Sequence, residues 1–120
     1  MVKRIYKIFR VVLFQSLSTN RPIKDNSRRI GPLMLTGLGK ISLGSVDFGV
    51  EEGIGFFSSY TLLDARLEND EINIGNGVKI NNGFSAIAQN SSIVIGDNVL
   101  IGNSVSLFAS DFHAIDPKHR

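Results

Sequence analysis

The chain has 120 residues, of which 42% are hydrophobic and 20% are charged, and it contains no cysteine. This length corresponds to one domain, and the absence of cysteine excludes disulfides, thiolate nucleophiles and thiolate-bound metals. Residues 1–40 carry nine basic side chains and one acidic one, whereas residues 41–120 carry four basic and ten acidic ones. We expect no nucleic-acid partner, because no nucleic-acid motif follows the basic arm and the acidic body would repel phosphate. A surface with anionic lipid suits the arm better.

The first 17 residues, MVKRIYKIFRVVLFQSL, predict an amphipathic helix. Its longest apolar run, residues 11–14, is far too short to cross a bilayer, and no signal-peptide cleavage site follows it. One side of the helix gathers apolar residues, namely Ile5, Phe9, Val12 and Leu13. The basic residues Lys3, Lys7 and Arg10 lie elsewhere on it. Two interpretations follow: the helix lies on an anionic membrane surface, or it packs its apolar side on the body.

Residues 19–40 keep no hydrophobic period and contain two prolines and three glycines, which predicts a connecting loop. We therefore expect a basic N-terminal segment over residues 1–35, helical at first and then irregular. The domain proper is expected over residues 36–120.

The body repeats a four-residue pattern, which we call the repeated word: an aliphatic residue, then any residue, then an aliphatic residue, then glycine. It occurs as ISLG at 41–44, INIG at 72–75 and IVIG at 93–96. The interval between the first two words is longer than between the others, and EEGIGFFSSYTLL at 51–63 supplies the extra length as an excursion.

Within the repeats, aliphatic or small residues recur every six positions. One series is Ile74, Ile80 and Ala86, and another is Ile95, Ile101 and Leu107. This spacing fits neither a helix nor a long alternating strand, but it fits short strands joined by turns that coil into a solenoid with an aliphatic interior. The glycines and asparagines that follow the aliphatic residues suit sharp corners. An ordinary antiparallel β sandwich is the alternative.

The segments INIGNGVKINN and IVIGDNVLIGNSVSLFASDFHAIDPKHR resemble the hexapeptide-repeat acyltransferases, in particular bacterial O-acetyltransferases of sugars and surface polysaccharides. The resemblance covers residues 36–120. It implies an all-β fold, a left-handed parallel β-helix preceded by the N-terminal helical or irregular segment, and the handedness comes from the resemblance alone.

The stretch SDFHAID at 110–116 breaks the register, because an unpaired carboxylate cannot face a narrow aliphatic interior. We expect it to leave the wall as a loop that carries Asp111 and His113. Imidazole has a pKa close to neutral and can remove a proton from an attacking alcohol. The resemblance implies that His113 is this general base, with Asp111 orienting the ring or holding a sugar hydroxyl; a structural histidine in a turn is the alternative.

The resemblance also places Asn81 at the active cleft, as a group that binds substrate; alternatively, Asn81 and Asn82 only form a corner. His119, near the end of the sequence, is expected to be a solvated tail residue. With only two histidines six residues apart we expect no metal site. Serines 85, 91 and 92 lack a base that would make them nucleophiles, so a covalent acyl-enzyme is not favoured.

The sequence thus predicts an O-acetyltransferase that moves an acetyl group from acetyl-CoA to a saccharide hydroxyl. A non-catalytic β-helix used for assembly, or an inactive fragment of such an enzyme, is the alternative. The resemblance implies a homotrimer. We expect a cytoplasmic location, peripheral to the inner face of the membrane if residues 1–17 bind lipid.

Relatives in this family continue for several coils beyond the histidine loop, and those coils carry much of the coenzyme groove. We therefore expect the 120 residues to be a fragment whose cofactor-binding residues lie mostly downstream.

Overall fold

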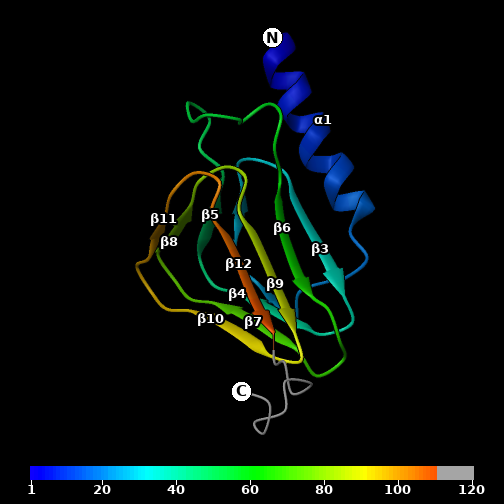
Figure 1. The fold of residues 1–120 in the computed structure, drawn as a ribbon. Helices are drawn as coiled ribbons and strands as arrows, with labels where there is room; N and C mark the ends of the chain where they lie inside the picture. The colour runs from blue at the N-terminus through cyan, green and yellow to red at the C-terminus, as the bar shows by residue number, and fades with distance from the viewer. Residues whose placement is uncertain (111–120) are drawn as a thin grey trace, which may run out of the picture.

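The computed structural model describes residues 1–110, which form one N-terminal helix followed by twelve short strands (Figure 1). The elements are α1 (Val2–Leu17), β1 (Lys24–Asp25), β2 (Arg28–Arg29), β3 (Leu33–Gly37), β4 (Lys40–Leu43), β5 (Val46–Phe48), β6 (Thr61–Ala65), β7 (Glu71–Ile74), β8 (Val78–Ile80), β9 (Ser85–Gln89), β10 (Ser92–Ile95), β11 (Leu100–Ile101) and β12 (Ser106–Ser110).

Every third strand joins the same sheet, and all neighbouring strands in the described chain are parallel. The orders are β1-β4-β7-β10 in sheet A, β2-β5-β8-β11 in sheet B and β3-β6-β9-β12 in sheet C. The chain therefore passes through three walls in turn and completes four coils. This is an all-β, parallel β-helix-like architecture with one N-terminal helix.

The repeated words stack on one another in sheet A, as the spacing predicts. Ile72 of β7 lies opposite Ile41 of β4 and Ile93 of β10. Inward-facing aliphatic residues from all three walls fill the interior, and Ile74, Ile80 and Ala86 are each at most 4% exposed. Burial of each valine, leucine or isoleucine side chain in this interior contributes about 1.5–3 kcal/mol.

The corners use left-handed backbone, but only some of the residues expected there adopt it. Asn98 has a φ of 58°, and Gly77 and Gly83 have φ values of 70° and 77°. The glycines directly after the repeated aliphatic residues do not have positive φ. At Gly75 the requirement is close approach instead, because a Cβ there would collide with the Asp97 carboxylate of the next coil.

The loop prediction for residues 19–40 was wrong, because these residues contain β1, β2 and β3, the first coil. The two-residue strands β1 and β2 have mostly exposed side chains, so no aliphatic period marks them. Backbone hydrogen bonds from Ile23 N–H to the Ile41 carbonyl and from Asn26 N–H to the Leu43 carbonyl hold them to the second coil. Strands of the body thus begin at Lys24, ahead of the expected boundary at residue 36.

The predicted excursion is confirmed except at its end, because residues 61–63 already belong to β6. Residues 49–60 leave the wall between β5 and β6 and form a series of turns, and the chain returns at Thr61. We call residues 49–60 the excursion loop. In Figure 1 it lies beside α1, at the corner where sheet B passes into sheet C.

Candidate functional site

The two residues on which the catalytic hypothesis depends, Asp111 and His113, lie outside the described residues, as does His119. The structure does describe the place from which that segment starts. Strand β12 ends at Ser110, which lies opposite Gln89 of β9 in sheet C. The candidate site is therefore built around the corner at which sheet C passes into sheet A.

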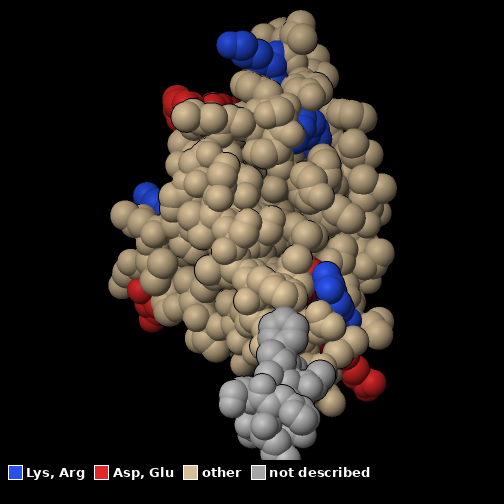
Figure 2. Space-filling model, in the orientation of Figure 1, with Lys and Arg blue, Asp and Glu red and all other residues tan. Residues whose placement is uncertain are grey.

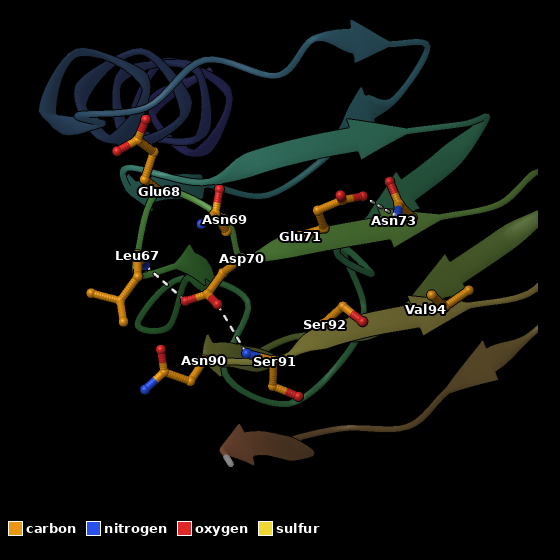
Figure 3. Close-up of a pocket in the computed structure, with 10 residues that line it drawn as sticks. All are labelled: Leu67, Glu68, Asn69, Asp70, Glu71, Asn73, Asn90, Ser91, Ser92 and Val94. Atoms are coloured by element: carbon orange, nitrogen blue, oxygen red, sulfur yellow. Dashed lines mark hydrogen bonds between the residues drawn. The ribbon is translucent and has the colours of Figure 1, made fainter.

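A shallow hollow opens at this corner, formed by the β6–β7 and β9–β10 turns and the adjoining outer surface of sheet A (Figure 3). Its lining is mostly polar and comprises Leu67, Glu68, Asn69, Asp70, Glu71, Asn73, Asn90, Ser91, Ser92 and Val94. Amide, hydroxyl and carboxylate groups of this kind can bind the hydroxyls of a saccharide.

Asp70 at the centre of the hollow is only 2% exposed. Its carboxylate accepts hydrogen bonds from the backbone N–H groups of Leu67, at 2.8 Å, and Ser91, at 2.9 Å (Figure 3). It therefore ties the turn of one coil to the turn of the next. Because both carboxylate oxygens are engaged, we assign Asp70 a structural role and not that of a base.

A second polar cluster lies at the same end of sheet C. The Arg66 Nε donates to Asp64 Oδ2 at 3.1 Å, and its Nη1 donates to Gln89 Oε1 at 3.4 Å. Since Gln89 lies opposite Ser110, this cluster borders the start of the segment that carries Asp111 and His113. Sequence reasoning missed Arg66, because only the 23-residue offset between coils brings it to Gln89.

Asn81, the expected substrate-binding residue, lies at a different corner. It follows β8 and precedes β9, so it is at the opposite end of sheet C from Ser110. Its Oδ1 accepts a hydrogen bond from the Asn82 backbone N–H at 2.7 Å. The described part of one chain thus does not bring Asn81 to the corner where β12 ends.

The neighbouring Asn82 holds the excursion loop. It is 5% exposed, its Oδ1 accepts from Val50 N–H at 3.0 Å, and its Nδ2 donates to the carbonyls of Val50 and Ile54 at 2.9 and 3.2 Å. In the next coil Asn103 also donates to the Ile54 carbonyl, at 2.7 Å. The repeated asparagines were the only sequence signal for this contact.

Among residues 1–110, no group of three histidine, aspartate or glutamate side chains is placed to hold a metal ion. Both histidines lie beyond these residues, so the expectation of no metal site stays a prediction.

Comparison of the chain with family models, with curated proteins and with solved structures finds no match in any of the three. The family therefore remains a hypothesis that rests on the repeated words and on the Asp111–His113 segment.

Proposed function

We propose that the chain is an acetyl-CoA-dependent O-acetyltransferase of the hexapeptide-repeat type, with a left-handed β-helix, that acts on a hydroxyl of a saccharide. The observation that carries the proposal is the continuity between scaffold and motif. Four parallel coils lead through β12 directly into the Asp-Phe-His sequence, and a rigid scaffold next to a polar segment is a common setting for catalysis.

In this mechanism His113 removes the proton from the acceptor hydroxyl as its oxygen attacks the thioester carbonyl carbon of acetyl-CoA. The new C–O bond forms, the C–S bond breaks, and the departing CoA sulfur takes the proton from the imidazolium. Asp111 orients the imidazole ring or holds a neighbouring sugar hydroxyl.

Arg66 and Gln89 are the described residues best suited to assist in acceptor binding. The Arg66 side chain is 44% exposed and keeps donors beyond its contacts with Asp64 and Gln89. A guanidinium and an amide at the edge of the corner suit hydroxyl and carboxylate groups of a sugar.

A homotrimer would account for the separation of Asn81 from Ser110, because the family resemblance implies sites shared between neighbouring subunits. The outer face of sheet C supports self-association. It carries Met34, Leu62, Ile87 and Phe108, and Phe108 is 58% exposed. Few charged side chains occur over this face (Figure 2). The same face favours the second candidate, a non-catalytic assembly module, and the role of His113 separates the two.

The test is release of free CoA thiol from acetyl-CoA by the chain in the presence of a panel of polysaccharides. We expect the substitution His113→Ala to reduce acceptor-dependent release on the order of a hundred- to ten-thousand-fold, the usual effect of removing a general base. His119→Ala is the matched control and should retain activity. Equal activity of the two variants would contradict the mechanism.

A further inference from the structure

The apolar side of α1 points away from the body of the protein. Its side chains are Val2, Ile5, Ile8, Phe9, Val12 and Leu13, which we call the apolar face of α1. All six are between 37% and 81% exposed. Packing of this side on the solenoid, one of the two interpretations of the sequence, is therefore wrong.

The opposite side of α1 is fixed to the excursion loop by polar and aromatic contacts. Arg10 is only 7% exposed and donates to the carbonyls of Phe56, at 2.7 Å, and Ser59, at 2.6 Å. The Phe14 ring stacks on Tyr60 with centroids 4.6 Å apart. These contacts set the rotation of the helix about its axis, so the apolar face is presented outward by the fold.

The N-terminal end of α1 also carries cations, and Lys3 and Arg4 border the hollow that the helix forms with Glu51 and Glu52 of the excursion loop. Lys3 and Arg4 are exposed and form no ion pair with any residue in the described part of the chain, and residues 1–17 contain no acidic side chain. Figure 1 shows that the N-terminal end of α1 extends beyond the coils, and Figure 2 shows basic side chains at that end of the molecule.

We infer that α1 lies in the interfacial region of a membrane that contains anionic lipid, with its apolar face among the acyl chains and with Lys3 and Arg4 at the headgroups. A single helix with an exposed apolar face can lie in the plane of a bilayer, and exposed cations at the N-terminal end of α1 complement anionic headgroups. Each of the hollows found in residues 1–110 has charged side chains in its lining, which the apolar face of α1 from a second copy would have to desolvate. No helix in the described chain is long and apolar enough to cross a membrane.

The test is flotation of the full 120-residue chain with vesicles of phosphatidylcholine alone or of phosphatidylcholine mixed with phosphatidylglycerol. The double variant Ile5→Ser/Phe9→Ser should reduce binding to the mixed vesicles by at least about tenfold, because two apolar anchors are lost. Lys3→Gln/Arg4→Gln should reduce binding to the mixed vesicles by roughly fivefold per cation and leave binding to neutral vesicles unchanged.

The matched control is Val94→Ser/Leu100→Ser, which removes two exposed apolar residues from the walls of the coils. It should bind vesicles as the unmodified chain does, with circular dichroism checking that all variants are folded. Unchanged binding by Ile5→Ser/Phe9→Ser, or an equal loss in the control, overturns the inference. The molar mass of Ile5→Ser/Phe9→Ser is also measured by light scattering. A lower mass than that of the unmodified chain, with vesicle binding retained, would overturn the inference, because the apolar face would then join copies of the chain. The inference does not depend on acetyl transfer.

Discussion

Arg10 is the one charged side chain of α1 that the fold buries, and it is buried against carbonyl groups, not against a carboxylate. Hydrogen bonds from a charged donor are worth about 1.5–3 kcal/mol each. Arg10 also lies over the faces of Tyr6 and Phe14, at 5.8 and 5.9 Å from the ring centroids. The attachment of helix to loop therefore concentrates on one residue.

We predict that Arg10→Met destabilises the docked helix by about 2–3 kcal/mol, because the carbonyls of Phe56 and Ser59 lose their donors. Urea unfolding and the rate of limited proteolysis within residues 1–20 measure this. Arg4→Met, at an exposed position of the same helix, should change the free energy of unfolding by no more than about 0.5 kcal/mol and leave the rate of proteolysis nearly unchanged. Equal protease resistance of the two variants would show that Arg10 does not hold the helix.

The sequence indicated the amphipathic helix but not which side would be buried. Arg10 is separated from Phe56 by 46 residues, and its partners are backbone carbonyls that no side-chain pattern reveals. The apolar residues of α1 were visible in the sequence; their exposure depends on the excursion loop.

Among the elements, the turn from β3 to β4 depends on a glycine. Gly37 has a φ of 97°, and a Cβ there would collide with the Ala65 carbonyl of the next coil. Gly96, between β10 and β11, has no atom within 4 Å of the equivalent Cβ position. There is therefore room for a Cβ atom at Gly96 but not at Gly37.

We predict that Gly37→Ala lowers the free energy of unfolding by at least about 2 kcal/mol, since it adds both backbone strain and a clash between adjacent coils. Gly96→Ala should stay within about 0.5 kcal/mol of the unmodified protein. Thermal unfolding followed by circular dichroism distinguishes the two. Similar melting temperatures would mean that the first two coils can separate at Gly37 without cost.

The sequence predicted best those strands whose inward residues are aliphatic. Ile72, Ile74, Val78 and Ile80 repeat in register with their neighbours, and the structure buries all four. The first coil was missed because β1 and β2 follow the second coil through backbone hydrogen bonds, which any sequence can form.

At the scale of the whole molecule, the three walls differ in their outer surfaces. Sheet A and sheet B present charged groups such as Lys40, Glu71 and Lys79, whereas the outer side of sheet C is mostly uncharged and carries Phe108. This asymmetry makes sheet C the candidate wall for contact between subunits.

We predict that Phe108→Asp lowers the molar mass of the protein in solution, because a charge on this wall would have to be desolvated in an interface. Val94→Asp introduces the same charge at a side chain 72% exposed on sheet A and should leave the mass unchanged. Light scattering coupled to gel filtration measures both. A single-subunit mass for the unmodified chain would rule out the shared site.

For the candidate site, the sequence singled out only residues whose own chemistry is conspicuous, and these, Asp111 and His113, stay predictions because they lie outside the described residues. His113 and Asp111 stood out because charge does not belong in an aliphatic interior, whereas the surrounding corner did not stand out. Asp70 resembles any surface acid in the sequence, yet two backbone N–H groups from turns of consecutive coils, those of Leu67 and Ser91, converge on its side chain.

The register between the last two coils is the same on all three walls. Glu71 lies opposite Ser92, Lys79 opposite Leu100 and Ser85 opposite Ser106, each pair 21 residues apart. A duplicated segment of that length would therefore fit without moving any existing residue to another wall, and it would lengthen the molecule by about 4.8 Å. The length of this architecture is thus quantised: genetic duplication can change it in whole steps while its cross-section stays constant.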